Sequence, residues 1–181
     1  MVSWYSKWRK DFEPRAFIDF FKDEPMDSSL GEAFNYSNSA YHILGFIIEK
    51  VSGQTYKQFI ESNIFEPLGM KSSYYGSTSK IIKKRASGYQ KDGKYINAEF
   101  LSLTQAYSQG AIMSTVKDLY IWNRAIRSYN ILKKESIELA FTNHQLNNNK
   151  RINYGYGWDI NEINILPLLS TMGVYLAIAL L

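Results

Sequence analysis

Apolar side chains recur at intervals of three and four residues in several stretches of the chain, which is the spacing of one face of an α-helix. The clearest stretch runs from Ala40 to Val51, and the apolar residues on its common side are Tyr41, Leu44, Ile47, Ile48 and Val51. Gly53 follows at a position where helices often end in a left-handed residue. The pattern therefore predicts an amphipathic helix over 40–51 with this stripe facing inward.

Four further helices are predicted from the same spacing and from their boundary residues. Pro14 suits the first turn of a helix that carries three phenylalanines, and Thr55 suits the N-cap of one that stops before Pro67. Ser114 is predicted to cap a third helix, and a short one follows near 134–141. The residues expected to face inward on the third helix are Val116, Leu119, Trp122 and Ile126.

The segments between these helices have the composition of loops and short strands. Residues 26–38 are polar and read as a loop, while 71–113 are rich in Ser, Tyr and Gly with short strands near 86–90 and 95–100. Residues 152–160 alternate and predict another strand. The expected class is α+β, mostly helical with a few strands.

Composition limits the chemistry more than it defines the function. The 181 residues are 45% hydrophobic and 15% aromatic, which fits a globular domain. Without Cys and with only two His, neither a metal site nor a cofactor is expected. The net charge of +4 comes from scattered basic clusters, which are interpreted as solvated surface and not as a nucleic-acid site. The N-terminus lacks the apolar stretch of a signal peptide.

Candidate nucleophiles and ligands are weak when each is taken alone. Ser-x-x-Lys, which places an amine one helical turn from a hydroxyl, occurs at Ser77–Lys80 and at Ser114–Lys117. So short a pattern is expected by chance, and Ser114 already has a capping role. His42, inside an apolar helix, and His144, in a polar turn, have no metal-ligand spacing and are interpreted as satisfied or solvated histidines.

A longer pattern is more specific. Residues 34–70 contain, in order, Phe-Asn-Tyr-Ser-Asn, Leu-Gly-Phe-Ile-Ile-Glu-Lys-Val-Ser-Gly and Ile-Phe-Glu-Pro-Leu-Gly-Met. This order closely resembles the family of serine β-lactamases and penicillin-binding proteins, which includes class C β-lactamases, D-Ala-D-Ala carboxypeptidases and related esterases. The resemblance continues through Arg85–Tyr89, Met113–Trp122 and Tyr154–Trp158 and covers roughly residues 14–160.

The resemblance implies roles for two residues. Tyr36 matches the active-site tyrosine that relays the proton of the attacking serine, which requires a phenol acidified by nearby positive charge. Asn38 matches the asparagine that orients a lysine and binds the carbonyl of the substrate amide. Gln109-Gly110-Ala111 matches a family Ala-Gly-Gly/Ser segment and departs from it at the first and last positions. The implied substrate is a small molecule or a peptidoglycan-like peptide.

Two catalytic elements of the family are missing from the sequence. None of the 35 residues before Tyr36 contains the Ser-x-x-Lys nucleophile, and no Lys-Thr-Gly or His-x-Gly follows the Tyr-Gly-Tyr-Gly-Trp strand. The resemblance therefore implies a truncated β-lactamase-like hydrolase, made of the helical lobe and part of the α/β lobe, without a nucleophile and inactive alone. Faces left open by the missing part are expected near Trp4–Trp8 and Tyr74–Tyr75, with poor solubility or association as the result.

The apolar tail 163–181 is treated separately from the partial domain 1–162. It has 19 residues without a charge, and it stops resembling the family after Asn164. A reading-frame slip near residue 165 is the favoured interpretation, because a shifted frame permits the missing His-x-Gly. A membrane anchor and a buried strand pair are the alternatives.

Two other functions stay open from sequence alone. The chain could be an active enzyme that recruits Ser77 or another nucleophile, or that is completed by a separately encoded piece. It could also be a non-catalytic ligand-binding or membrane-attached module. Family members are often periplasmic or secreted, but the sequence does not define the compartment.

Overall fold

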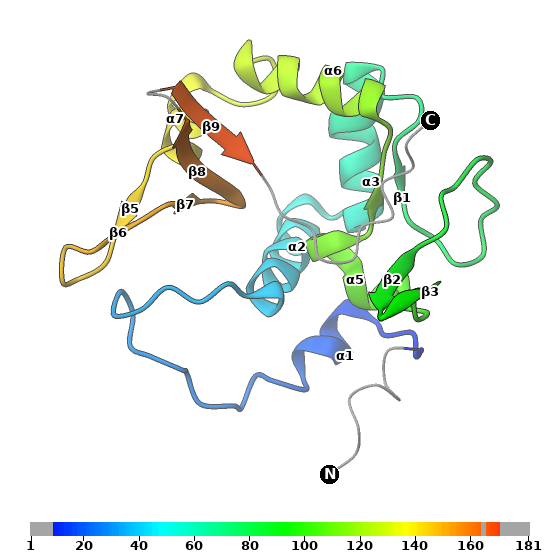
Figure 1. The fold of residues 1–181 in the computed structure, drawn as a ribbon, viewed down its shortest axis with the longest axis horizontal. Helices are drawn as coiled ribbons and strands as arrows, with labels where there is room; N and C mark the ends of the chain where they lie inside the picture. The colour runs from blue at the N-terminus through cyan, green and yellow to red at the C-terminus, as the bar shows by residue number, and fades with distance from the viewer. Residues whose placement is uncertain (1–8, 164–165, 171–181) are drawn as a thin grey trace. The chain divides into compact units, whose positions relative to one another are not determined.

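The computed structural model describes residues 9–163 and 166–170, and it combines helices with short antiparallel strands (Figure 1). The predicted α+β class, mostly helical with a few strands, is confirmed. The described residues form two compact units: the first comprises 9–23 and 37–122, and the second comprises 24–36, 123–163 and 166–170. The predicted boundary after residue 162 separates the domain from the apolar tail, and it does not correspond to the division between these two units.

The helices and strands follow one another along the chain in this order: α1 (Pro14–Ile18), α2 (Asn38–Ser52), α3 (Tyr56–Ile60), the π-helical η2 (Glu61–Phe65), α4 (Glu66–Leu68), β1 (Tyr74–Tyr75), β2 (Tyr89–Asp92), β3 (Lys94–Asn97), α5 (Leu103–Gly110), β4 (Ile112–Met113), α6 (Val116–Arg127), α7 (Lys134–Ala140), β5 (His144–Gln145), β6 (Arg151–Ile152), β7 (Tyr154–Gly155), β8 (Trp158–Ile163) and β9 (Leu166–Ser170).

Helix α2 ends at Gly53 as predicted, but it begins at Asn38, two residues before the predicted start at Ala40. The Ser37 hydroxyl accepts the backbone N–H of Ala40 at 3.1 Å, which caps the first turn. Gly53 ends the helix with a φ of 69°, a left-handed conformation that glycine adopts without steric cost.

The apolar stripe of α2 faces inward only in part, because Ile48 packs against the buried core and Tyr41 is half-buried while the other three residues are exposed. Leu44, Ile47 and Val51 are 50%, 48% and 84% exposed, while His42 and Gly45 are buried. The reason is a close approach of α5, because a Cβ atom at Gly45 would overlap the Ser108 side chain. The helix therefore contacts α5 through Gly45, and Leu44, Ile47 and Val51 stay exposed to solvent.

The second helical run passes through Pro67, although a stop before it was predicted. Thr55 caps α3 in a reciprocal capping box with Gln58, as expected for this residue. The run then widens into the π-helical η2, and Pro67 lies in the first turn of α4, where no N–H is required. Gly69, with a φ of 70°, ends the run.

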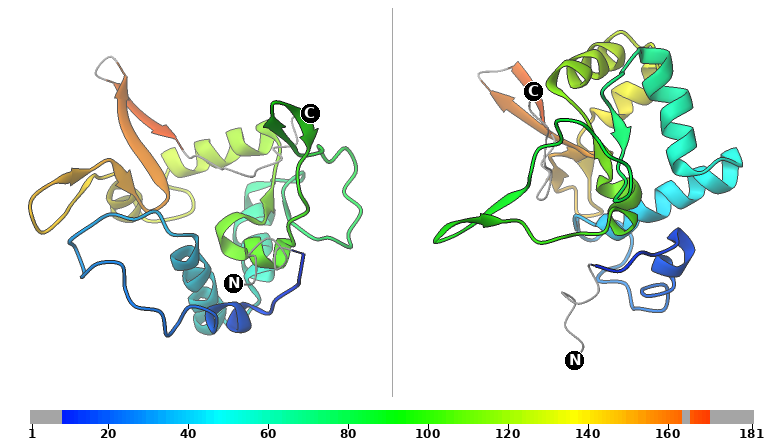
Figure 2. Two further views of the ribbon diagram at one scale, coloured as in Figure 1. Left: turned by 60° about the horizontal axis from the view of Figure 1, so that its bottom comes forward. Right: turned by 90° about the vertical axis from the view of Figure 1, so that its right-hand side faces the viewer.

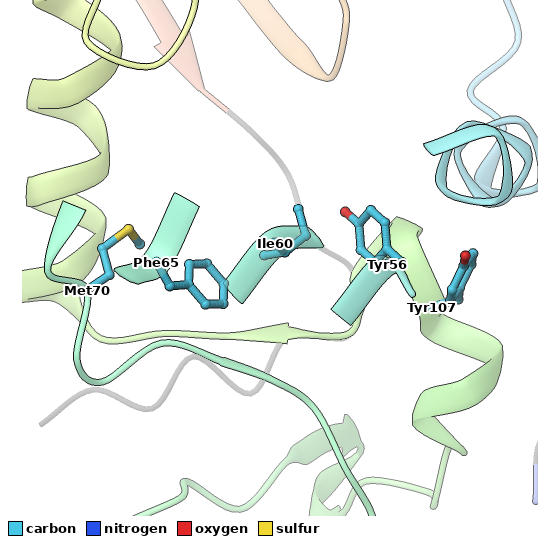
Figure 3. Close-up of a cluster of buried hydrophobic side chains, with 5 residues drawn as sticks. All are labelled: Tyr56, Ile60, Phe65, Met70 and Tyr107. Carbon is cyan, nitrogen blue, oxygen red and sulfur yellow. The ribbon is translucent and has the colours of Figure 1, made fainter. Parts of the chain in front are cut away.

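The core of the first unit is built on this run. Its buried members lie along one line of helical turns, with Tyr107 contributed by α5 (Figure 3). The buried cluster comprises Tyr56, Ile60, Phe65, Met70 and Tyr107. Tyr75 packs edge-on against Tyr56 at 5.9 Å between ring centroids, so Tyr74–Tyr75 is half-buried and not the exposed face that was predicted. The other predicted exposed face, Trp4–Trp8, lies outside the described residues.

Helix α6 is capped by Thr115, and the prediction of Ser114 as the cap is wrong. The Thr115 hydroxyl accepts the N–H of Asp118 at 3.2 Å, and its carbonyl accepts the N–H of Leu119. Val116 and Leu119 are 52% and 41% exposed, so only part of the predicted inward stripe is buried.

The strands of the first unit form two short pairs. β1 pairs with β4, and β2 pairs with β3 in a hairpin that projects from the helices of this unit (Figure 2). The hairpin strands, 89–92 and 94–97, are displaced from the predicted 86–90 and 95–100 because Gly93 makes a tight turn with a φ of 65°.

The second unit contains α7 near its predicted position and two small antiparallel sheets. β5 pairs with β6, and β7, β8 and β9 form a three-stranded sheet. The predicted strand 152–160 is broken by a turn at Tyr156 and Gly157, whose φ values are 42° and 98°. In the apolar tail, Leu166–Ser170 pairs with β8 as β9, and 171–181 lies outside the described residues.

Within the described residues, no helix combines the length and apolar character needed to cross a bilayer.

Candidate functional site

The Tyr-x-Asn element lies where the chain passes from the second unit to the first. Tyr36 is the last residue of the segment 24–36, and Asn38 is the first residue of α2. Tyr36 therefore belongs to the second unit and Asn38 to the first.

Tyr36 is an exposed phenol held by another aromatic ring. Its ring lies edge-on to Tyr154 with 6.3 Å between centroids, and Phe34 lies 5.0 Å from the same Tyr154 ring. The side chain of Tyr36 remains 59% exposed. Aromatic contacts on one side and solvent on the other leave the hydroxyl accessible to a reacting group.

Asn38 is exposed and does not serve as the helix cap. The neighbouring Ser37 supplies the capping oxygen, so the first turn of α2 does not occupy the Asn38 carboxamide. Among the described residues, the Asn38 side chain forms no hydrogen bond. An amide in this state can offer both a donor and an acceptor to a substrate.

Ser114 and Lys117 do not form a nucleophile–base pair. The Ser73 hydroxyl donates to the buried Asp118 carboxylate at 2.8 Å, so Ser114, at 2.8 Å from Ser73, donates to Ser73. Lys117 is exposed on α6. Ser114 therefore belongs to a structural network that joins the start of α6 to Ser72 and Ser73.

Ser77 and Lys80 are likewise not arranged for proton transfer. The Ser77 oxygen accepts the backbone N–H groups of Ser79 and Lys80 at 3.2 and 3.1 Å, as in a serine turn. The Lys80 ammonium lies 5.0 Å above the ring of Tyr74. No serine hydroxyl in the described part of the chain bonds to a lysine amine.

His42 is completely buried between the rings of Phe17 and Tyr107. Its Nε2 lies 3.1 Å from the Pro14 carbonyl and donates to it, while Nδ1 has no partner. Burial lowers the pKa of His42 below its ordinary value, although the Pro14 carbonyl opposes this shift. The interpretation as a satisfied histidine therefore holds for one ring nitrogen only.

His144 opens strand β5, where its ring lies 5.3 Å from that of Tyr156. Its Nε2 is buried without a hydrogen-bond partner, so it is neither satisfied nor solvated at that atom. Across the described residues, no three acidic or histidine side chains gather as metal ligands would.

Three tyrosines near Glu49 belong to the core or lie against it: Tyr56 and Tyr107 are buried, and Tyr75 is half-buried. Burial, with Glu49 nearby, raises the pKa of Tyr75 and of Tyr107, and burial alone raises that of Tyr56. Glu49 also accepts the backbone N–H of Tyr56 at 2.7 Å. These phenols keep their protons and stabilise the core, so they are poor candidates for a proton relay.

The second unit also contains an open pocket of about 540 Å³ that was not predicted from the sequence. It is lined by Phe141, Thr142, Asn143, Arg151, Asn153, Ile160 and Asn161. These residues come from three separate segments without a motif, and Arg151 is the one ionised group in the lining. With the Asn143 amide oriented toward Arg151, its oxygen accepts from Nε at 2.7 Å.

Comparison with known proteins settles the family. The model of the β-lactamase family matches residues 2–174. The chain belongs to this family. The match extends past Asn164, where the resemblance had been expected to stop, so the family region includes strand β9.

Similar proteins agree with this assignment. A penicillin-binding protein of Bacillus subtilis (strain 168) is 33% identical over 140 residues, which cover 70% of this chain and 31% of that protein. The mitochondrial serine β-lactamase-like protein LACTB of Homo sapiens is 25% identical over 165 residues, with 80% and 30% covered. The chain thus spans about three tenths of the length of these relatives.

Solved structures show the same relationship. A penicillin-binding protein homologue from Pyrococcus abyssi is 32% identical with a TM-score of 0.67, covering 82% of this chain and 35% of that one. The D-amino acid amidase from Ochrobactrum anthropi SV3 has a TM-score of 0.74 at 21% identity, covering 89% and 50%. The second likeness concerns the fold alone.

Proposed function

We propose that this chain is the part of a β-lactamase-like serine hydrolase that carries the Tyr-x-Asn element, with Tyr36 as proton relay and Asn38 as substrate-binding amide. The observation that carries the proposal is the state of these two side chains. The Tyr36 phenol is exposed while its ring is held by Tyr154, and Ser37 leaves the Asn38 amide free of a capping role.

The reaction is acyl transfer to a serine, followed by hydrolysis. The serine oxygen attacks the substrate carbonyl carbon while its proton passes to Tyr36 as the phenolate, and the resulting phenol gives this proton to the leaving nitrogen or oxygen as that bond breaks. Water then hydrolyses the acyl-serine and restores the serine hydroxyl. Asn38 donates to the carbonyl oxygen of the substrate amide. The relatives named as penicillin-binding proteins favour amide or peptide-like substrates over other carbonyl compounds.

We further propose that the chain alone does not form an acyl-enzyme. Both Ser-x-x-Lys serines engage in structural hydrogen bonds, and neither follows the family order, in which the nucleophile precedes Tyr-x-Asn. Removing the nucleophile from such a catalytic unit leaves only a small residual activity.

Mass spectrometry with a penicillin-like β-lactam tests this proposal. The 181-residue chain is expected to show no covalent adduct, and an adduct on Ser77 or Ser114 would contradict the proposal. A fusion that adds a family Ser-x-x-Lys segment before residue 1, with a His-x-Gly element restored after Trp158, is expected to acylate and turn over.

In that fusion, Tyr36→Phe should lower turnover by more than about tenfold, because it removes the relay but keeps the ring. Tyr156→Phe, at a tyrosine that is also exposed in the second unit, is the matched control and should leave turnover unchanged. Equal turnover of the two variants would show that Tyr36 has another role.

A further inference from the structure

The β2–β3 hairpin has two chemically different faces. Side chains alternate along a strand, and directly paired residues share a face, so the pairs Tyr89–Asn97 and Lys91–Tyr95 lie together on one side. Tyr89 and Tyr95 are 65% and 76% exposed. Gln90 and Ile96, paired on the opposite side, are half-buried. The hairpin therefore turns two tyrosines and a lysine to solvent.

The loop that leads into this hairpin also carries exposed basic side chains. Between residues 80 and 98 the chain has six basic side chains and one acidic one, a local net charge of +5 against +4 for all 181 residues. All six are exposed, and in the described part of the chain none of them forms an ion pair. Lys94 pairs with Asp92 on the opposite side of the hairpin. We call the following residues the basic hairpin patch: Lys80, Ile81, Lys83, Lys84, Arg85, Tyr89, Lys91 and Tyr95.

Ile81 distinguishes between two classes of anionic partner. It is 91% exposed in the middle of the basic loop. An aliphatic side chain gains little against stacked bases, which favour aromatic platforms. It gains free energy when it enters the boundary between lipid headgroups and acyl chains, where tyrosines also partition and basic residues meet lipid phosphates.

We propose that the basic hairpin patch binds the surface of an anionic phospholipid bilayer. The basic residues are attracted to the charged headgroups, while Ile81, Tyr89 and Tyr95 enter the interfacial layer. This contact does not depend on catalysis or on the apolar tail, and it lies within the first unit.

Co-sedimentation of the full 181-residue chain with vesicles tests the proposal. Binding is expected to vesicles of phosphatidylcholine that contain phosphatidylglycerol, and to weaken as salt rises. The variant K83Q/K84Q/R85Q should bind at least about tenfold more weakly, because each basic residue at an anionic surface contributes roughly fivefold in affinity. Ile81→Ser should weaken binding further at constant charge.

The matched control K57Q/K71Q/K117Q removes the same charge from exposed lysines elsewhere in the first unit and should lower affinity much less. Equal loss in the two triple variants would overturn the proposal, as would equal binding to pure phosphatidylcholine vesicles. Binding of single-stranded DNA in preference to anionic vesicles would overturn it in favour of a nucleic-acid surface.

Discussion

Asp118 accepts the hydroxyl hydrogen of Ser73 at 2.8 Å, joining two segments that lie 45 positions apart in the sequence. The same carboxylate oxygen accepts the backbone N–H of Ser72 at 2.8 Å, and Asp118 is only 3% exposed. A buried carboxylate with these donors holds the start of α6 against the segment before β1.

Replacing Asp118 by Ala should lower the free energy of unfolding by about 2–4 kcal/mol, because the Ser72 N–H and the Ser73 hydroxyl lose their acceptor in a buried site. Urea unfolding followed by circular dichroism measures the change. Asp92→Ala, on the exposed hairpin, is the control and should cost less than about 0.5 kcal/mol. Similar changes in unfolding free energy for the two variants would show that the hydrogen bonds of Asp118 do not stabilise the fold.

His42 predicts a pH dependence of stability. Because burial holds its folded-state pKa below the ordinary value, the unfolded chain binds the proton more readily. Stability should therefore fall as the pH drops below about 6.5, the unfolded pKa, and level off below the folded pKa. Between pH 8 and pH 5, the unfolding free energy of the wild type should fall relative to that of His42→Leu. Parallel plots of unfolding free energy against pH for the two proteins would contradict this prediction.

Gly45→Ala tests the close approach of α2 and α5. Alanine is the better helix former by about 1 kcal/mol, yet its Cβ would overlap Ser108 and lie 2.9 Å from the Tyr107 ring. We expect a net loss of about 2 kcal/mol or more from overpacking. Gly110→Ala is the matched control, since the nearest atom to its added Cβ is 4.0 Å away. A lower melting temperature for Gly110→Ala than for Gly45→Ala would refute the packing argument.

The exposed stripe of α2 should make the chain self-associate. Ile43, Leu44, Ile47 and Val51 are between 36% and 84% exposed on one helix, and contiguous apolar surface of this kind promotes association. The double variant L44K/I47K should shift sedimentation velocity profiles toward the monomer at equal concentration. Substitution of isolated exposed residues, Leu132→Lys and Leu139→Lys, should leave association unchanged. If these substitutions reduce association and L44K/I47K does not, the contact between chains does not involve α2.

Local signals in the sequence predicted the fold where one residue determines a boundary. Thr55, Gly53 and Pro14 mark helix ends through their own backbone and side-chain chemistry, and all three do so in the structure. The cap of α6 was misplaced by one residue because Ser114 and Thr115 are both good caps, and the choice depends on Ser73, which binds Ser114.

Predictions of burial failed where packing partners are distant in sequence. The spacing of apolar residues in α2 predicted the helix correctly but only part of its buried side, because Ser108 on α5 meets Gly45, and of the stripe Ile48 packs against the core while Leu44, Ile47 and Val51 stay exposed. The Tyr-x-Asn residues were found through an extended motif. The exposure of the Tyr36 ring and the absence of a capping role for Asn38 could not be predicted in the same way. They depend on Tyr154, more than a hundred positions away, and on the capping choice of Ser37.

The π-helical segment Glu61–Phe65 has a consequence for chain length. The buried residues Ile60 and Phe65 are five positions apart, and the backbone N–H of Glu66 bonds to the carbonyl of Glu61, five residues earlier. A wider turn accommodates one residue more than an α-helix of equal rise. A homologous protein that is one residue shorter between Ile60 and Pro67 could thus keep the same core with an uninterrupted α-helix, so an alignment gap at this point records a change of helical pitch and no change of fold.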